Sequence, residues 1–300
     1  MLNRRHIRIK VMQTIYAMHQ NGSDNIDSQE KFLLSAIENV QDLYLTMVSI
    51  FSELKNVEED FLFKTSKKHF ATAEELKPNT KFTENQVFDI LTNSVSLNNA
   101  LVARQINVWK NNDDYIQLLL KEIKLSDIYA TYMASTTSSL EEDKQFVADI
   151  FSKVIAPNDK LYEYLEDNKL TWIDDIPLVN TLILKQIKQL GEEEESFFVP
   201  RLYKDIDDKE YAKNLFKKTV LNEKEFEKEF MSKTQNWDVD RIAEIDAIIL
   251  KMAICEFLKF PSIPVKVTIN EYSELAKEYS TGKSSIFING ILDNLVKEYT

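Results

Sequence analysis

The sequence predicts an all-α protein, and two observations carry this prediction. Its 300 residues include only 4 glycines and 6 prolines. Sheets, phosphate-binding loops and tight hairpins consume these residues, so their scarcity argues against a Rossmann domain, a P-loop or a β-barrel as the main body. Apolar residues also recur at helical spacing, beginning with Ile7, Val11, Ile15 and Met18.

Composition indicates a globular protein with one large domain or two small ones. Hydrophobic residues make up 44% and charged residues 29% of the chain, so a core can form without a disulfide or a metal. Cys255, the single cysteine, excludes an intramolecular disulfide and a cysteine-rich zinc site. The first residues do not form a signal sequence, and no apolar run is long enough to span a bilayer. We therefore expect a cytoplasmic protein that does not enter a membrane.

The first predicted helix, over residues 4–20, concentrates positive charge in an acidic chain. The net charge is −12, yet Arg4, Arg5, Arg8 and Lys10 precede the first acidic residue. Cations at a helix N-terminus oppose the helix dipole, at a cost of about 0.3–1 kcal/mol each. The sequence allows two interpretations, namely a local site for an anionic ligand or a solvated helix start.

Further helices are predicted along the middle of the chain. A turn over 21–24 follows the first helix, and 28–63 is predicted to hold one long or two short helices. Thr83 is predicted to cap a long amphipathic helix that runs from 84 to about 110, and a second helical stretch covers 113–134.

A polar connector over 135–139 is predicted to be an internal boundary. Gly191 is expected to end a helix before an exposed acidic loop over 192–195. The remaining helices are predicted at residues 140–155, 159–168, 177–190, 208–221, 223–234, 239–259, 267–279 and 284–299.

A weak internal repeat links two of these helical segments. Asp143-Lys144 recurs as Asp208-Lys209, and Trp172 recurs as Trp237 at the same offset. One explanation is that 140–190 is a partial duplicate of a later helical unit. The alternative is chance similarity between two acidic amphipathic helices.

The motifs of common enzymes are absent from the sequence. His6, His19 and His69 do not form a zinc-binding spacing, and no nucleophile elbow or glycine-rich phosphate loop occurs. We therefore expect a protein that is not an enzyme and has no cofactor or metal. The remaining classes are a binding module and a scaffold.

The C-terminal part carries the most specific pattern. It reads WDxDRIAxIDxxIL over 237–250, IPxKVxINEYxELAKxYSTxKS over 263–284 and FINGILDNLxKE over 287–298. Gly290 interrupts the last predicted helix, which suggests close packing by a neighbouring helix or the approach of a ligand. Together with RRHIRIKVMQTIYAMHQ over 4–20, this pattern closely resembles the NusB family of transcription antitermination proteins.

The resemblance implies an organisation and a function. The fold would consist of NusB-like helical bundles, with an arginine-rich helix over 1–20 and a C-terminal bundle over 207–300, separated by an additional helical insertion over 21–206. Members bind boxA-type single-stranded RNA together with a small-subunit ribosomal protein acting as NusE. The pair joins the RNA polymerase antitermination complex during transcription of ribosomal RNA. The alternative is a helical protein–protein scaffold that has lost RNA binding, and a homodimer stays open in either case.

The resemblance also implies which residues act. Asp246 matches an acidic position that faces the protein partner. His6 replaces a usual arginine and Ile286 a usual lysine, and Lys283 is expected to supply the lost charge. The implied RNA-binding residues are Arg4, Arg5, His6, Arg8, Gln13, Tyr16, Lys283 and Phe287.

Overall fold

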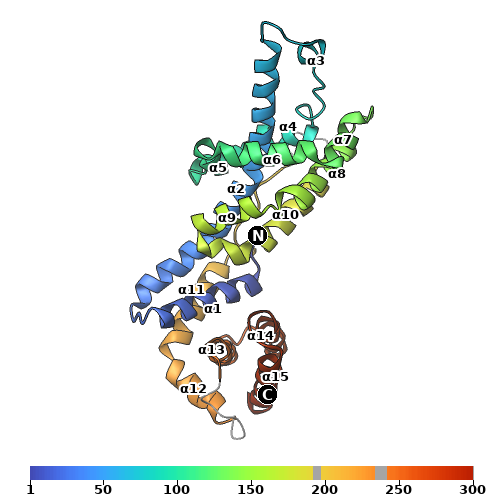
Figure 1. The fold of residues 1–300 in the computed structure, drawn as a ribbon. Coiled ribbons are helices and arrows are strands. Elements are labelled where there is room, and N and C mark those ends of the chain that lie inside the picture. The colour runs from blue at the N-terminus through green and yellow to red at the C-terminus, as the bar shows by residue number, and fades with distance from the viewer. Residues whose placement is uncertain (192–196, 234–241, 300) are drawn as a thin grey trace. The chain divides into compact units, whose positions relative to one another are not determined.

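The computed structural model describes residues 1–191, 197–233 and 242–299, and the regular secondary structure of these residues consists of helices (Figure 1). The described residues contain no strand, and their one isolated bridge joins Leu2 to Tyr203. The all-α prediction is confirmed. None of the described helices combines the length and apolarity that a membrane crossing needs.

The chain divides into two compact units. The first unit comprises Met1–Glu38 and Leu202–Thr300, and the second comprises Asn39–Arg201. The polar connector over 135–139 joins two helices inside the second unit, so it is a loop of that unit rather than a boundary.

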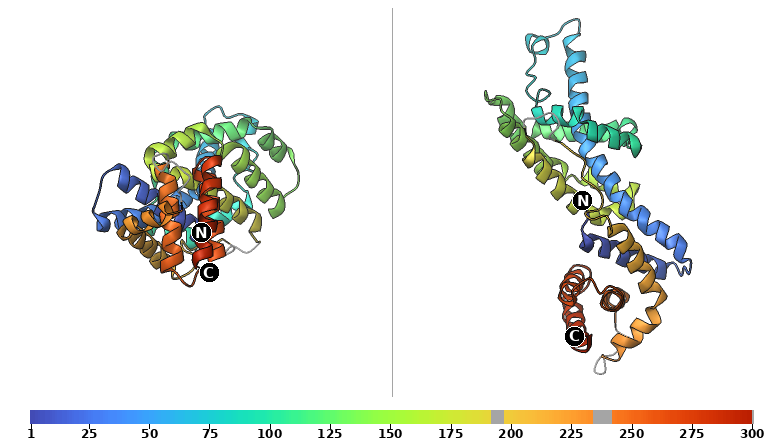
Figure 2. Two further views of the ribbon diagram at one scale, coloured as in Figure 1. Left: turned by 90° about the horizontal axis from the view of Figure 1, so that it is seen from below. Right: turned by 180° about the vertical axis from the view of Figure 1, so that it is seen from behind.

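The first unit brings together the two ends of the chain. Helices α13, α14 and α15 pack on one another, as both ribbon figures show, and α1 packs on α11 and α13 (Figures 1 and 2). Besides the first part of α2 (Ile26–Ser66), the unit consists of α1 (Arg4–Gln20), α11 (Asp208–Leu221), α12 (Glu223–Met231), α13 (Glu244–Lys259), α14 (Val265–Tyr279) and α15 (Gly282–Tyr299).

The end of α1 confirms the predicted turn. Gly22 has a φ of +57°, a left-handed conformation that glycine adopts without strain. The amide of Gly22 donates to the carbonyl of His19 at 3.0 Å, and that of Ser23 donates to Met18 at 3.1 Å. These two bonds form a Schellman cap, which satisfies the last carbonyls of the helix.

The second unit begins within one long helix and continues through shorter ones. α2 spans 41 residues without a break, so the first of the two sequence alternatives for 28–63 is correct. The later part of α2 (Ile26–Ser66) is followed by α3 (Ala73–Leu76), α4 (Gln86–Asn93), α5 (Val95–Ala103), η1 (Val108–Asn111), α6 (Asp113–Leu125), α7 (Asp127–Ala134), α8 (Leu140–Ile150), η2 (Phe151–Ile155), α9 (Asp159–Asn168), η3 (Leu170–Asp175) and α10 (Ile176–Gln189).

The prediction of one long helix over 84–110 is wrong. Asn85 rather than Thr83 caps α4, because its side chain accepts from the amide of Val87 at 2.9 Å. Ser94 then ends α4 and caps α5, and its hydroxyl also donates to the carbonyl of Phe197 at 3.1 Å. This tertiary bond holds Ser94 in an extended conformation that a continuous helix could not adopt.

Phenylalanine rings pack together within the core of the second unit. Phe82 lies 5.1 Å from Phe88 and 6.0 Å from Phe146 between ring centroids, and Phe51 lies 5.7 Å from Phe151. The predicted helix over 140–155 is confirmed, although its last turn is a π-helix.

Most of the other predicted helices are confirmed. α9 and α11 begin and end where the sequence predicts, and α10 ends one residue before the prediction. The acidic loop predicted over 192–195 and the tryptophan at 237 lie outside the described residues.

The two segments of the weak repeat resemble each other in their packing and in the burial of their apolar positions. Whether one is a duplicate of the other is not tested by this, so the duplication stays a prediction. α8 packs on α10 and α4, and α11 packs on α13 and α1. Asp143 accepts from the amide of Gln86, the first residue of α4, and Asp208 accepts from Arg4, the first residue of α1. The matched apolar positions are buried in both segments, namely Phe146 and Tyr211, Phe151 and Phe216, Leu161 and Phe226, and Leu165 and Phe230.

The surroundings of Gly290 do not fit one of the two explanations that the sequence offered for it, namely close packing by a neighbouring helix. The residue is exposed, and a Cβ atom placed there would meet no atom of the described residues within 4 Å. None of the described helices packs closely enough on Gly290 to require a glycine there.

The two glycines are expected to respond oppositely to alanine. Gly22→Ala should lower the free energy of unfolding by about 1 kcal/mol, because alanine is strained at positive φ. Gly290→Ala should raise it by up to about 1 kcal/mol, because alanine favours an exposed helical position. Urea unfolding followed by circular dichroism measures both. Equal effects of the same sign would contradict this interpretation.

Candidate nucleic-acid interface

The start of α1 is held by a capping box. The Asn3 side chain accepts from the amides of Arg5 at 2.9 Å and His6 at 3.2 Å. In return, the amide of Asn3 donates to Nδ1 of His6 at 3.3 Å. Burial and the charge of Arg5 lower the pKa of His6, so the ring stays neutral and Nδ1 can accept. The predicted RNA-binding residue His6 is thus part of the helix cap.

Arg8 forms a buried ion pair in the middle of the first unit. Its guanidinium donates to Glu256 on α13 through two bonds, Nε to Oε2 at 2.9 Å and Nη2 to Oε1 at 2.6 Å. The side chains of Arg8 and Glu256 are 2% and 0% exposed. Burial alone would lower the pKa of Arg8, but the hydrogen bonds to Glu256 raise it above its ordinary value. Arg8 therefore remains charged inside the unit.

Glu256 accepts three further hydrogen bonds from hydroxyl groups. Tyr211 on α11 donates at 2.8 Å, and Thr268 and Tyr272 on α14 donate at 2.8 and 3.1 Å. Burial raises the pKa of both tyrosines, so the hydroxyls remain protonated donors. A buried carboxylate is tolerated only when such bonds replace water. This network joins α1, α11, α13 and α14.

Arg4 and Arg5 also pair with carboxylates, but part of each arginine side chain stays in solvent. Arg5 donates to Glu271 on α14 through Nε at 2.9 Å and Nη2 at 3.0 Å, and this bond raises the pKa of Arg5. Nε of Arg4 donates to Asp208 at 3.1 Å, and its guanidinium lies 4.8 Å from the centre of the Tyr211 ring. Each of the two arginine side chains is 40% exposed.

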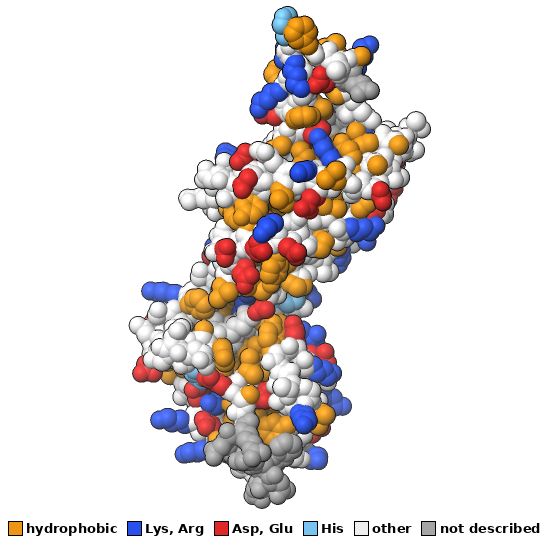
Figure 3. Space-filling model, viewed as in Figure 1, with side chains coloured by type: hydrophobic (Ala, Val, Ile, Leu, Met, Phe, Trp, Pro, Cys, Tyr) orange, Lys and Arg blue, Asp and Glu red, His pale blue; other side chains and the backbone are white. Residues whose placement is uncertain are grey.

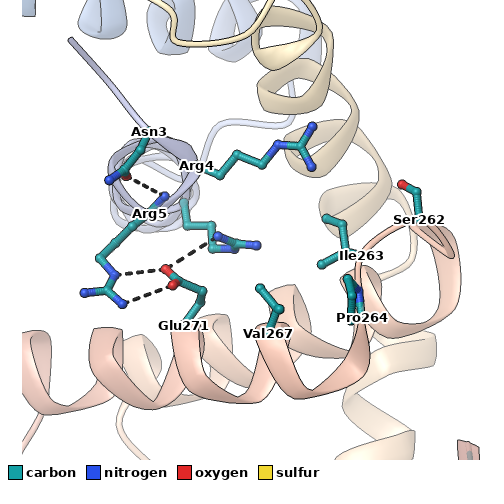
Figure 4. A pocket seen from close by; sticks show the side chains of 9 residues that line it. Asn3, Arg4, Arg5, Ser262, Ile263, Pro264, Val267 and Glu271 are labelled. Carbon is teal, nitrogen blue, oxygen red and sulfur yellow. Dashed lines mark hydrogen bonds and ion pairs between the residues drawn. The ribbon is translucent and has the colours of Figure 1, made fainter.

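The three arginines meet at one hollow in the first unit, which has a volume of about 510 Å³ (Figure 4). The N-terminal end of α1 forms one side, and the turn between α13 and α14 forms the other. Its described lining residues are Asn3, Arg4, Arg5, Arg8, Ser262, Ile263, Pro264, Val267 and Glu271.

The carboxylates in this region explain why cations stand at the start of a helix. Asp208, Glu256 and Glu271 come from three other helices, and they offset the unfavourable position of the arginines relative to the helix dipole. An anionic ligand is therefore not required to account for the basic helix start.

Two predicted RNA-binding residues in the later turns of α1 lie on the same face of the helix as Arg5. Helical spacing places Gln13 and Tyr16 on this side, with Gln13 half-buried and Tyr16 39% exposed. An arginine, an amide and an aromatic ring thus follow one another along a single face of α1.

The predicted residues of α15 differ in exposure. Lys283 is exposed in the first turn, whereas Phe287 is 8% exposed and Ile286 is 74% exposed. Lys283 and Phe287 are not among the described residues that line the hollow. Of the two neighbouring apolar side chains, Ile286 rather than Phe287 reaches solvent.

Asp246, the predicted protein-partner residue, is 2% exposed in the first turn of α13. Its carboxylate accepts a hydrogen bond from the hydroxyl of Ser280, which follows α14. The described contact of Asp246 therefore joins two parts of the first unit.

The acidic partners of the arginines, Asp208, Glu256 and Glu271, were not predicted from the sequence. Glu256 lies in the apolar segment MAICEFL, and a single carboxylate inside such a segment indicates a buried partner of opposite charge. The sequence does not say which cation this partner is, because Arg8 is 248 residues away.

Comparison with known proteins shows which family the chain belongs to. A model of the NusB family matches residues 178–297. The transcription antitermination protein NusB of Thermodesulfovibrio yellowstonii is 39% identical over 121 residues, which are 40% of this chain and 80% of that protein. This chain belongs to the NusB family. No solved structure matches it.

Other NusB relatives match a smaller share of their own length. The transcription antitermination protein NusB of Salinibacter ruber is 38% identical over 95 residues, covering 32% of this chain and 59% of that protein. The protein of the same name from Finegoldia magna is 46% identical over 86 residues, covering 27% and 63%. The chain spans 59%, 64% and 58% of the length of three such relatives, which is less than two thirds.

Removing Arg8 should destabilise the protein far more than removing Arg5. Arg8→Met leaves Glu256 buried without a cation, and we expect a loss of about 3–5 kcal/mol in the free energy of unfolding. Arg5→Met, the matched control, breaks a half-exposed pair and should cost about 1 kcal/mol or less. Urea unfolding measures both.

A double variant separates charge from packing. Adding Glu256→Gln to Arg8→Met removes the buried charge and keeps an acceptor for the hydroxyl groups, so part of the stability should return. An Arg8→Met variant as stable as the Arg5→Met control would contradict a central role for the pair.

The capping role of His6 predicts a pH dependence. The lowered pKa means that neutral His6 contributes stability above pH 6.5, and this contribution is lost as the pH falls through the lower folded pKa. His6→Gln keeps an acceptor that does not titrate. We expect the wild type to lose more stability than this variant on acidification below pH 6.5. Parallel pH curves of unfolding would contradict the prediction.

Proposed function

We propose that this NusB-family chain is a transcription antitermination factor that binds boxA-type single-stranded RNA. In this proposal it acts together with a small-subunit ribosomal protein in the role of NusE, in the RNA polymerase antitermination complex that forms during transcription of ribosomal RNA. Its role is binding rather than catalysis. The helical segment between the two NusB-like parts is an addition to the RNA-binding unit.

The observation that carries the proposal is the arginine-lined hollow in an otherwise acidic protein. The net charge of −12 disfavours indiscriminate binding to nucleic acid. Two half-exposed arginines at one end of α1 supply a local anion site instead. Single-stranded RNA is recognised by a few charges, by stacking and by contacts to base edges. The arginines can supply the charges, and Tyr16 and Gln13 of the same helix can supply the other two.

The exposure of each residue suggests its role. Arg4 and Arg5 contact phosphates, while Gln13 and Tyr16 contact bases along the same helix. Lys283 adds a further phosphate contact from the exposed start of α15.

The buried residues of the predicted site act indirectly in this proposal. Arg8 and His6 hold α1 in place, Phe287 supports the first turns of α15, and Asp246 supports the segment after α14 that would meet the protein partner.

One observation favours the alternative of a protein-binding scaffold. Arg4 and Arg5 already have carboxylate partners, and a phosphate must compete with Asp208 and Glu271. RNA binding therefore requires that the guanidinium groups contact phosphate through their remaining donors or exchange partners.

A binding titration decides between the two functions. We expect a labelled boxA-like RNA to bind more tightly than a scrambled RNA, and the ribosomal protein to strengthen this binding. Arg5→Ala should weaken binding about tenfold and reduce the slope of affinity against salt by about 0.7, the value for one lost phosphate contact on a single strand. Tyr16→Ala should weaken binding by about 1–3 kcal/mol.

Lys217→Ala is the matched control, because Lys217 is also a half-exposed cation that pairs with a carboxylate, Glu30, in the first unit. This variant should bind RNA as the wild type does. Equal, weak binding of both RNAs with and without the ribosomal protein would favour the scaffold.

A further inference from the structure

Exposed aromatic rings and cations alternate at the end of α2, in the second unit. We call these five residues the tip patch: Phe63, Lys67, Lys68, His69 and Phe70. Phe63 is 63% exposed and Phe70 is 89% exposed. Figure 3 shows hydrophobic, lysine and histidine side chains together over the end of α2. A group of solvent-exposed aromatic side chains is typical of an interaction site.

The rings of the tip patch lie beside positive or titratable groups. Nζ of Lys67 is 5.1 Å from the centre of the Phe63 ring, and the rings of His69 and Phe70 are 4.7 Å apart. Lys68 pairs with Glu75 at 2.7 Å, whereas Lys67 has no carboxylate partner among the described residues. The tip patch thus offers flat faces together with an unneutralised cation.

A hollow of about 560 Å³ adjoins the tip patch between α2 and α6. Phe61 and Leu125 supply apolar surface, and Lys64, next to Phe63 in the chain, lines the side towards the tip patch. Lys124 lies 4.8 Å above the ring of Phe61 and pairs with Glu58, while Lys121 has no carboxylate partner among the described residues. The combination of ring and lysine therefore continues into the hollow, where Glu58, Asp60 and Asp113 also line the wall and Asp60 pairs with Lys64.

The tip patch is locally positive in an acidic chain. Residues 61–73 contain three lysines and no aspartate or glutamate, in a protein whose net charge is −12. Local positive charge attracts phosphate, and exposed aromatic faces stack on unpaired bases of any sequence. A duplex offers phosphates but hides its base faces, so this combination suits a single strand. An acidic peptide would use the lysines but not the flat, solvent-facing rings.

We propose that the tip patch and the adjoining hollow form a second contact for single-stranded RNA, on the unit that has no assigned role. Phe63 and Phe70 stack on bases, and Lys67 and Lys121 contact phosphates. The inference rests on the proposed RNA binding by the first unit and extends it to nucleotides outside the boxA-like segment. The second contact favours longer RNA and is largely independent of base sequence.

The test compares two RNA lengths on the full chain. One probe is a boxA-like RNA of about 12 nucleotides, and the other carries the same segment within about 40 nucleotides of unstructured sequence, since one single-strand site covers about 4–16 nucleotides. The variants are Phe63→Ala with Phe70→Ala, and Lys67→Ala with Lys121→Ala. The matched controls are Phe198→Ala and Lys185→Ala, which remove an exposed ring and an exposed lysine elsewhere in the second unit.

We expect the long RNA to bind the wild type more tightly than the short RNA. The aromatic variant should reduce this advantage at least about fivefold, since stacking on one ring is worth about 1–3 kcal/mol. The lysine variant should reduce the salt slope for the long RNA by about 1.4, at about 0.7 for each lost phosphate contact. The short RNA and both controls should be unaffected, and ultraviolet cross-links from the long RNA should map to residues 61–70.

The outcomes separate this inference from the proposed function. If both variants bind the long RNA like the wild type and no cross-link maps to 61–70, the second contact is refuted. If instead the short RNA fails to bind or ignores Arg5→Ala, the proposed site on the first unit fails. Loss of long-RNA binding in the tip-patch variants would still support the second contact in that case.

Discussion

The buried pair of Arg8 and Glu256 is the interaction on which the first unit depends. A charge without water must have an opposite charge and a full set of hydrogen bonds, and here four helices supply them. Because these bonds are directional, they allow only a narrow range of positions for α1 against α11, α13 and α14. Hydrophobic burial alone would tolerate rotation of an apolar helix. The pair therefore joins the N-terminal helix of the chain to its C-terminal helices in one orientation.

This constraint orders the three arginines of α1 by exposure. Arg8 is buried, whereas the side chains of Arg4 and Arg5, which also line the hollow, are each 40% exposed. The same residue type thus serves the fold at one position and remains accessible at two others. The cations of the proposed RNA site are already held by carboxylates. Such preorganisation limits the entropy lost on binding, at the expense of competition between phosphate and carboxylate.

The sequence predicted the helices well where caps and breaks are local. α9 begins after the cap Asn158, and α11 begins at an acidic first turn, and both match the predicted bounds. The predicted helix over 84–110 failed because Ser94 is held by a carbonyl that is 103 residues away. The candidate site was predicted only as a set of positions. The exposure of Phe287 and the pairing of the arginines depend on contacts between helices distant in the chain, which local patterns do not encode.

By itself, the sequence determined the helical class, the concentration of arginines at the first helix and the resemblance to the NusB family. These follow from composition, from short-range periodicity and from collinear motifs. Only the tertiary structure decided which arginine is buried, that His6 completes a cap, and that Asp246 bonds to Ser280 within the unit. It also decided that aromatic rings and lysines of α2 and α6 share one surface. The physical reason is the same in each case, because burial and charge pairing arise when distant segments meet.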